Sequence, residues 1–339
     1  SYADRASAYK ALGQQQEALK DYDEAIMLDP ALSQAYFYRA EIYDASDRIE
    51  DALADYGEVL RLEPENPSAC TKRGRCNFVL GRYQEALSDF QKATSLDPGD
   101  ADAYYGLGDT FRALRQFPQT LENYDQAIEL NPDYAAVFLS RGQTKFALGK
   151  VEKALDDYDR AIELDPENAV AYLSRGDLYD ALGRSEAALT DYGQAIHLAP
   201  EDGRAYFQRA EVYSAQGQLK DALVDYNDAV RLNPQEFAIL SSRGDALHAL
   251  GQDDEALADY DAAIELNPED AAVLHKRGRI RFAREQLPQA LDDFEEAADL
   301  SPEDSKIIAD RGAAYLLLGL LPKALADFDK LAQLEPCLL

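Results

Sequence analysis

Residue types that could support catalysis are few and scattered in this chain of 339 residues. The three histidines, His197, His248 and His275, have no cysteine or second histidine at metal-ligand spacing on the same expected helix. The sequence contains no phosphate loop of the form GxxxxGKS or GxxxxGKT, no GxSxG elbow and no HExxH helix. Carboxylates are abundant, but surface helices carry acids for solubility, so a pair of them indicates nothing. We therefore predict that the chain is not an enzyme and uses no cofactor or metal.

The charge of the chain narrows the class of partner. Its net charge is −30, from 34 basic and 64 acidic residues. Nucleic acids bind mainly through lysine and arginine, and anionic lipid surfaces attract basic segments, so neither is an expected partner. No apolar run approaches the roughly 20 residues of a membrane span, so direct membrane insertion is not expected either. A protein or peptide partner remains.

Cysteine usage indicates no disulfide framework. The chain has three cysteines, Cys70, Cys76 and Cys337, an odd number, and the first two are too far apart for a metal-ligand pair on one helix. We interpret them as reduced packing residues. No targeting segment is visible, so a cytoplasmic location is slightly favoured, with the compartment otherwise unknown.

An arginine and an aspartate recur with regular spacing and suggest an internal ion pair. The sequence repeats ten times with a period of 34 residues, and the arginine occupies the same position in nine of these repeats. The aspartate follows the arginine by 16 residues. In the remaining repeat both are lost together, as Leu107 and Asn123. We hypothesise that each pair joins two helices of one repeat, because losing one charge removes the reason for the other. The alternative is that both side chains are solvated, since lone surface pairs contribute little.

The helices that carry the recurring arginine and aspartate can be predicted from the 34-residue period of the sequence. A period of this length is typical of stacked supersecondary units. Ten prolines keep that period throughout: Pro30, Pro64, Pro98, Pro132, Pro166, Pro200, Pro234, Pro268, Pro302 and Pro336. Ala18, Tyr22 and Ala25 step by four and then three, which places them on one face of a helix. A second stripe upstream, at Tyr2 and its equivalents, predicts two helices in each repeat.

Glycine and proline mark the expected helix boundaries. Gly13 recurs in seven repeats between the two helices, where a left-handed residue closes the first of them. The periodic prolines follow the second helix. The other four prolines fall in the first turn of an expected helix, where proline is tolerated because that amide has no intrahelical partner; they are Pro67, Pro118, Pro288 and Pro322.

These residues resemble the tetratricopeptide repeat family. The family's order of aromatic, leucine-glycine, tyrosine, alanine, aromatic and proline is similar to Tyr172, Arg175-Gly176, Tyr179, Ala188, Tyr192 and Pro200. The likeness recurs ten times and covers the whole chain. Two features depart from it: the first aromatic is never tryptophan, and arginine replaces the leucine in nine repeats. The resemblance implies an all-α, right-handed α-solenoid, a superhelix of stacked helix-turn-helix repeats.

The expected domain organisation is a single solenoid of ten repeats over residues 1–339. Its first repeat is truncated at the start, and the chain stops at Cys337-Leu338-Leu339 without a C-terminal capping helix. Repeat arrays normally close with a polar cap. The chain is therefore expected to be a piece of a longer array, or to be covered at its ends by another molecule, including a second copy in an end-to-end homo-oligomer.

The resemblance also places the first helices of the repeats on a concave groove, where basic and aromatic residues gather in two clusters. A basic group beside an aromatic ring suits an extended peptide that carries a carboxylate; the alternative is a solvated face with internal ion pairs. The first cluster comprises Tyr38, Lys72, Arg75, Phe78, Tyr105 and Arg112, and the second comprises His275, Lys276, Arg279, Phe282 and Lys306.

We therefore predict a non-catalytic scaffold that binds a peptide or protein segment in its groove. One alternative is a structural element that self-assembles through its uncapped ends. Another is the recognition arm of a larger multidomain enzyme.

Overall fold

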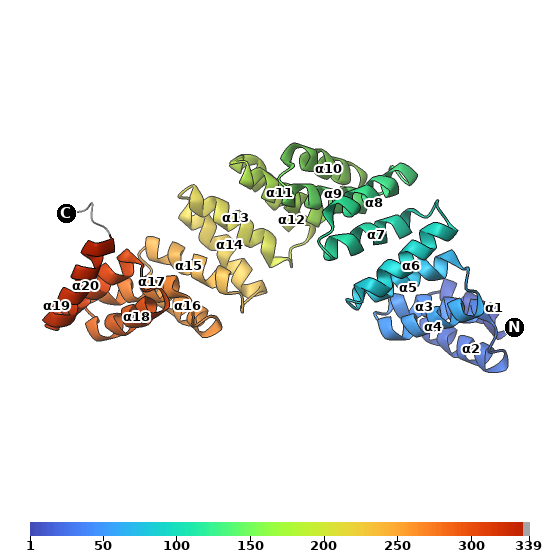
Figure 1. The fold of residues 1–339 in the computed structure, drawn as a ribbon, viewed down its shortest axis with the longest axis horizontal. Coiled ribbons are helices and arrows are strands. Elements are labelled where there is room, and N and C mark those ends of the chain that lie inside the picture. The colour runs from blue at the N-terminus through green and yellow to red at the C-terminus, as the bar shows by residue number, and fades with distance from the viewer. Residues whose placement is uncertain (335–339) are drawn as a thin grey trace. The chain divides into compact units, whose positions relative to one another are not determined.

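The computed structural model describes residues 1–334, which form twenty α-helices with no strand in that range (Figure 1). The chain divides into two compact units, Ser1–Glu167 and Asn168–Leu339. The first unit contains α1(Tyr2–Ala11), α2(Gln15–Leu28), α3(Ser33–Ala45), α4(Ile49–Leu62), α5(Pro67–Val79), α6(Tyr83–Leu96), α7(Ala101–Ala113), α8(Phe117–Leu130), α9(Ala135–Ala147) and α10(Val151–Leu164). The second contains α11(Ala169–Ala181), α12(Ser185–Leu198), α13(Gly203–Ala215), α14(Leu219–Leu232), α15(Phe237–Ala249), α16(Asp253–Leu266), α17(Ala271–Ala283), α18(Leu287–Leu300), α19(Ser305–Leu317) and α20(Leu321–Leu334). The all-α solenoid expected from the period is confirmed.

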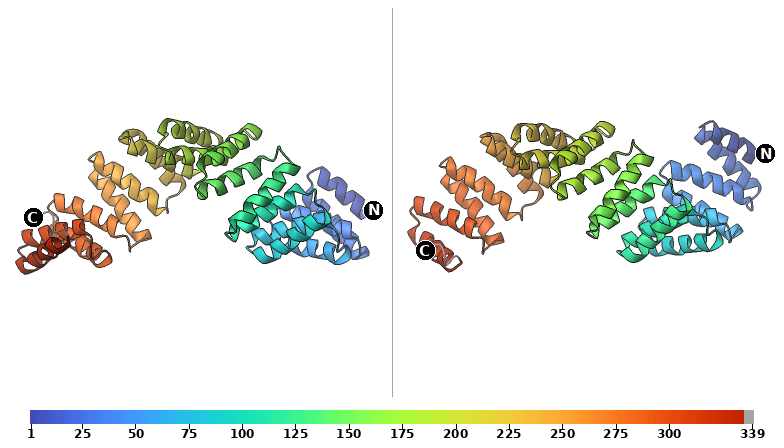
Figure 2. Two further views of the ribbon diagram at one scale, coloured as in Figure 1. Left: turned by 45° about the horizontal axis from the view of Figure 1, so that its top comes forward. Right: turned by 90° about the horizontal axis from the view of Figure 1, so that it is seen from above.

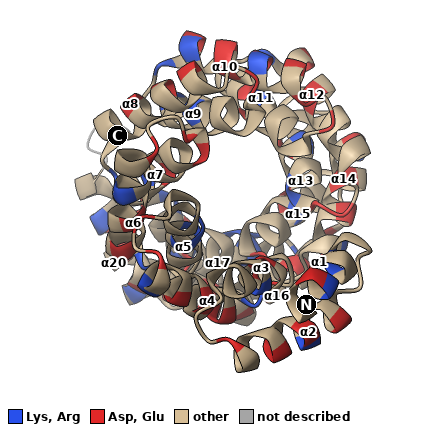
Figure 3. Ribbon diagram, turned by 90° about the vertical axis from the view of Figure 1, so that its right-hand side faces the viewer, with Lys and Arg blue, Asp and Glu red and all other residues tan. Residues whose placement is uncertain are grey.

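Each repeat is a pair of helices joined by a tight turn, and the pairs stack in sequence order within each unit (Figures 1 and 2). The first helices of successive repeats also contact one another, as α5 does with α7 and α7 with α9. In the first unit, α8 and α10 lie on the outer side of α7 and α9 (Figure 3). The first helices therefore form the inner face of this unit, which is the face expected to bind.

The helix boundaries agree with the glycine and proline positions. All seven recurring glycines adopt positive φ after a first helix, as Gly13 does at 73°. Pro67 is the first residue of α5, and Pro118 lies at the start of α8, where neither requires an amide donor. In three repeats a residue other than glycine takes the left-handed turn: Asp47, Arg115 and Glu285.

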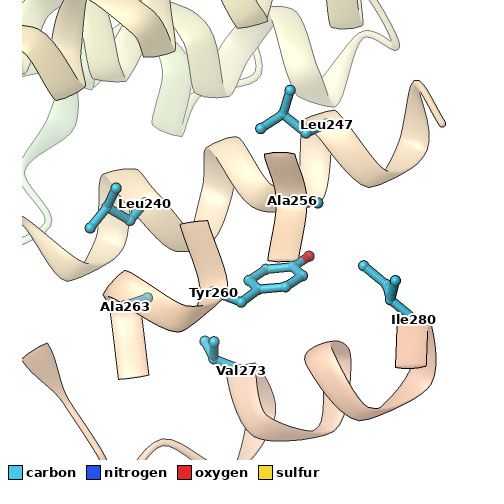
Figure 4. Packing of buried hydrophobic residues seen from close by; sticks show 7 residues of the cluster. All are labelled: Leu240, Leu247, Ala256, Tyr260, Ala263, Val273 and Ile280. Carbon is cyan, nitrogen blue, oxygen red and sulfur yellow. The ribbon is translucent and has the colours of Figure 1, made fainter. Parts of the chain in front are cut away.

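The core of each unit is built around the aromatic residue of the second helix. Tyr260 of α16 is 1% exposed and lies between Leu247 of α15 and Ile280 of the next repeat (Figure 4). A glycine on the first helix lets the ring approach closely, because a Cβ added at Gly244 would come within 2.6 Å of Tyr260. Tyr260 thus joins its own repeat to the one that follows.

The recurring arginine and aspartate form an ion pair in all nine repeats that contain them, which confirms the hypothesis. Arg39, for example, donates from Nε and Nη2 to the two oxygens of Asp55, both at 2.7 Å. The pairs are Arg5–Asp21, Arg39–Asp55, Arg73–Asp89, Arg141–Asp157, Arg175–Asp191, Arg209–Asp225, Arg243–Asp259, Arg277–Asp293 and Arg311–Asp327. Every one of these aspartates is buried. The alternative that both side chains are solvated is therefore wrong, because the aspartate is buried in every pair.

Three further expectations bear on the rest of the chain. Cys70 and Cys76 are buried free thiols on α5, as predicted. Cys337, Leu338 and Leu339, on which the uncapped end was predicted, lie outside the described residues, as does Pro336. Between residues 1 and 334, no helix combines the length and apolar character that a bilayer span requires.

Candidate functional site

The buried tyrosines fix the side chains on the floor of the inner face. Most of these tyrosine hydroxyls contact the side chain 15 residues earlier, on the first helix of the same repeat, as Tyr124 does when it donates to Asp109 at 2.6 Å. Tyr56 is an exception, since its hydroxyl has no hydrogen-bond partner among the described residues. Burial raises the pKa of Tyr124 above its ordinary value, so the hydroxyl stays protonated and acts as a donor. The same contact occurs in Ser7–Tyr22, Asp177–Tyr192, Glu211–Tyr226 and Asp245–Tyr260. These polar side chains are thus held by an internal partner.

The pattern reverses where the buried aromatic is phenylalanine. Phe90 and Phe294 have no hydroxyl, and the residues 15 positions earlier are Arg75 and Arg279. Their side chains are 63% and 68% exposed. In these two repeats a solvent-exposed guanidinium therefore takes the place of the hydrogen-bond acceptor.

A cavity of about 330 Å³ opens beside Arg75, between α5 and α7. We call it the α5–α7 cavity. It lies wholly within the first unit and has the size of a small ligand pocket. Its lining consists of Thr71, Lys72, Arg75, Phe78, Val79, Phe90, Asp102, Tyr105, Gly106, Asp109 and Tyr134.

The charged groups of this cavity differ in how strongly they are already engaged. Asp102 accepts a hydrogen bond of 2.6 Å from Tyr134, and Asp109 accepts one of 2.6 Å from Tyr124. Lys72 is half-buried and has no ion pair among the described residues, while Arg75 comes only within 3.8 Å of Asp44. The two bases are thus less engaged by neighbouring side chains than the two acids are.

Aromatic rings form much of the wall. Tyr105 and Tyr134 lie with their ring centroids 5.3 Å apart in an edge-to-face arrangement. The Tyr105 hydroxyl is 3.2 Å from the hydroxyl of Ser140, and burial raises the pKa of Tyr105, as does the nearby charge of Asp109. The wall therefore combines apolar faces with hydroxyls that remain neutral over the physiological pH range.

The structure brings four residues of the first predicted cluster together: Lys72, Arg75, Phe78 and Tyr105 all line the α5–α7 cavity. Arg112 does not; it lies 3.2 Å from Asp109 in an ion pair on α7. Tyr38 lies one repeat earlier, where it lines a smaller cavity of about 220 Å³.

Sequence reasoning missed the residues that complete the cavity. They are Thr71, Val79, Phe90, Asp102, Gly106, Asp109 and Tyr134. Two signals were present. Two of the three phenylalanines in the aromatic column, Phe90 and Phe294, have an arginine 15 residues earlier, whereas each tyrosine has a hydrogen-bond acceptor there. Gly106 is the only glycine at its position in ten repeats.

The second predicted cluster lies in the second unit, and its bases are engaged by acids. Lys276 donates to Asp245 at 2.7 Å, while His275 Nε2 lies 2.7 Å from an oxygen of Asp310. Arg279 lies 3.8 Å from that same carboxylate. Phe282 packs against Phe294 with ring centroids 6.2 Å apart, and Lys306 is exposed. These residues present less unpaired positive charge than Lys72 and Arg75.

The described residues hold no cluster of three or more His, Cys, Asp or Glu side chains positioned to bind a metal ion.

Comparison with protein families matches tetratricopeptide repeats along the chain. The family model described as "Tetratricopeptide repeat" matches residues 42–101, 173–236 and 275–336, which together exceed half of the chain. Other models of the same description match residues 101–134 and 1–32, and one described as "TPR repeat" matches 142–183 and 244–280. No curated relative matches the sequence.

Several solved structures share the fold. YrrB, described as a TPR protein with an unusual peptide-binding site, is 27% identical with a TM-score of 0.51, over 56% of this chain and 97% of its own. The pilF protein of Pseudomonas aeruginosa is 19% identical with a TM-score of 0.55, over 63% of this chain and 96% of its own. A monomeric mutant of IFIT1 with Gppp-AAAA is 16% identical with a TM-score of 0.51, over 98% of this chain and 90% of its own.

Proposed function

The chain belongs to the tetratricopeptide repeat family, and we propose that it is a non-catalytic scaffold that binds a carboxylate-bearing peptide segment of a partner protein in the α5–α7 cavity. A scaffold for protein–protein interaction is the role that the repeats and their structural neighbours support. One observation supports binding of a carboxylate-bearing peptide in the α5–α7 cavity. Lys72 and Arg75 are the bases of the cavity, they have no close ion pair among the described residues, and aromatic rings surround them.

The stacked fold suits such a ligand physically. Buried aromatic residues hold neighbouring repeats together, and an arginine–aspartate pair joins the two helices in nine of the ten repeats, so the inner face is already formed before a partner arrives. An extended segment then loses little free energy to rearrangement of its receptor. The similarity to YrrB, described as having a peptide-binding site, supports the same role.

The test is a peptide array of 12-residue segments probed with the wild-type chain and with two charge-reversed variants. Lys72→Glu combined with Arg75→Glu should weaken binding of acidic peptides at least tenfold, because the variant places like charge beside the ligand. Lys276→Glu combined with Arg279→Glu is the matched control in the second unit and should leave that binding unchanged.

Equal binding by wild type and the Lys72→Glu, Arg75→Glu variant would contradict the proposal. So would an oligonucleotide that binds the wild type in a Lys72- and Arg75-dependent manner while acidic peptides do not. Light scattering on the same samples tests the remaining alternative: concentration-dependent growth unaffected by the peptide indicates self-assembly.

A further inference from the structure

Gly106, which lines the α5–α7 cavity, is the only glycine at its position in the ten repeats. All nine other repeats carry a polar side chain there: Asp4, Tyr38, Lys72, Ser140, Ser174, Gln208, Ser242, Lys276 and Asp310. A Cβ built on Gly106 would come within 2.4 Å of the ring of Phe90. No real Cβ contact is that short, so the present position of Phe90 depends on the absence of a side chain at residue 106.

Phe90 consequently leans toward α7. A Cβ at Gly74, the usual neighbour of this ring within the repeat, would lie 3.0 Å from it, whereas the equivalent distance from Gly278 to Phe294 is 2.6 Å. The ring of Phe90 and the backbone at Gly106 both line the cavity. Together they form an apolar floor without a hydroxyl or a polar side chain.

The surroundings of this floor match a flat ring. Phe78 and Val79 of α5 form one wall, and Tyr105 and Tyr134 form the other. Aromatic pairs favour offset or edge-to-face contact at centroid separations of roughly 4.5–7 Å, which a ring placed over Phe90 would satisfy against several neighbours. A short aliphatic or polar side chain would leave this apolar surface incompletely covered.

The charged residues of the cavity lining favour a carboxylate over a phosphate beside the bound aromatic ring. Two bases, Lys72 and Arg75, face two acids, Asp102 and Asp109, so the lining is close to neutral overall. A singly charged carboxylate gains from Lys72, which has no ion pair among the described residues, and from Arg75, whose ion pair with Asp44 is as long as 3.8 Å. A phosphate, with a charge of about −1.5 to −2, meets stronger repulsion from Asp102 and Asp109.

We propose that the α5–α7 cavity is a subsite for an aromatic side chain directly adjacent to a carboxylate, and that Gly106 and Phe90 determine this specificity. The inference rests on the proposed function and narrows it to one ligand class. The carboxylate could be the C-terminus of the partner or the side chain of a neighbouring acidic residue.

The chain contains no tryptophan, so a tryptophan peptide supplies its own fluorescence signal. The probes are acetyl-Gly-Gly-Ser-Trp with a free C-terminus, its C-terminal amide, and acetyl-Gly-Asp-Trp amide, with the alanine equivalents as competitors. We expect a blue shift on binding of a carboxylate-bearing tryptophan peptide, an affinity at least tenfold above that of the uncharged amide, and no competition by the alanine peptides. Whichever of the two carboxylate probes binds identifies the source of the charge.

Gly106→Ser places a side chain against Phe90 and should lower the affinity at least tenfold. Gly57→Ser is the matched control, because a Cβ at Gly57 meets nothing within 4 Å. If Gly106→Ser fails to fold, Val79→Glu serves instead: Val79 is 58% exposed on the cavity wall, so the variant should fold and repel the carboxylate.

The outcomes separate the inference from the function on which it rests. Alanine and tryptophan peptides of equal affinity, or full affinity in both Gly106→Ser and Val79→Glu, overturn the aromatic subsite. If acidic peptides still require Lys72 and Arg75 in that case, the proposed function stands. If no peptide requires Lys72 and Arg75, both proposals fail.

Discussion

Arg209 donates hydrogen bonds to both carboxylate oxygens of Asp225, from Nε to Oδ2 at 2.7 Å and from Nη2 to Oδ1 at 2.8 Å. Asp225 is 3% exposed and the Arg209 side chain is 23% exposed. The bidentate contact joins α13 to α14 and neutralises a carboxylate that water does not reach. Burial of such a pair is costly, but removing one partner is costlier because it leaves the other charge uncompensated.

The first prediction follows from this contact. Arg209→Leu alone should destabilise the second unit by about 3 kcal/mol, since Asp225 then stays buried without its partner. Arg209→Leu combined with Asp225→Asn should cost much less than the sum of the two single changes. The chain already carries this combination as Leu107 and Asn123, where Leu107 packs in an apolar cluster with Phe90.

Native-state hydrogen exchange of the α13 and α14 amides measures the effect, because stability in a repeat array is partly local. Additive losses in the double-mutant cycle would show that the two residues act independently.

The sequence predicted the pairs and the helix boundaries because both recur in step with the core. Arg209 and Asp225 recur nine times and fail together once, so their coupling is visible in a single chain. The cavity was only partly predictable. Lys72 and Arg75 stood out as bases, but the contribution of Asp102 depends on Tyr134 of the following repeat, which a pattern within one repeat does not reveal.

A second prediction concerns Tyr56, whose buried hydroxyl has no hydrogen-bond partner among the described residues. Glu41, 15 residues earlier, pairs instead with Lys10 of the preceding repeat. Tyr56→Phe should therefore be neutral or raise stability by about 1 kcal/mol, since an unsatisfied buried donor is removed. Tyr260→Phe should lower stability by about 1.5 kcal/mol, because Tyr260 donates to Asp245 at 2.7 Å. Urea unfolding of both variants tests the contrast, and equal losses would contradict it.

A third prediction concerns the turn after α7. Arg115 adopts φ 57°, in the left-handed region where seven other repeats have glycine. Arg115→Gly should raise stability by about 0.5 kcal/mol, because relief of the backbone strain exceeds the extra entropy of glycine in the unfolded chain.

The reverse change is the control for Arg115. Gly149 has φ 70° and a Cβ there would meet nothing within 4 Å, so Gly149→Ala isolates the conformational cost. It should lower stability by about 1 kcal/mol. A gain in thermal midpoint for Gly149→Ala, or a loss for Arg115→Gly, would show that the turn is not strained.

A fourth prediction uses two aspartates of the second unit whose pKa values shift in opposite directions. Burial raises the pKa of Asp177 above 3.8, although it accepts hydrogen bonds from Tyr192 at 2.9 Å and Gln208 at 3.2 Å. The hydrogen bond from Arg204 lowers the pKa of Asp202 below 3.8. Ionised Asp177 therefore destabilises the folded state at neutral pH, and this penalty disappears as the pH falls through its raised folded pKa. Ionised Asp202 stabilises the folded state, and that contribution is lost as the pH falls below 3.8 and through its lowered folded pKa.

Asp177→Asn should accordingly be more stable than wild type at pH 7, and Asp202→Asn less stable. Both differences should shrink on acidification, that of Asp177→Asn first, because its folded pKa is the higher of the two. Asparagine keeps an acceptor oxygen for Tyr192 in one variant and for the Arg204 amide in the other, so hydrogen bonding is largely preserved. Thermal unfolding of the three proteins between pH 7 and pH 3 provides the comparison. The prediction is contradicted if the difference in thermal stability between Asp177→Asn and wild type grows as the pH falls. In that case the hydrogen bonds of Asp177 stabilise its ionised form more than burial destabilises it.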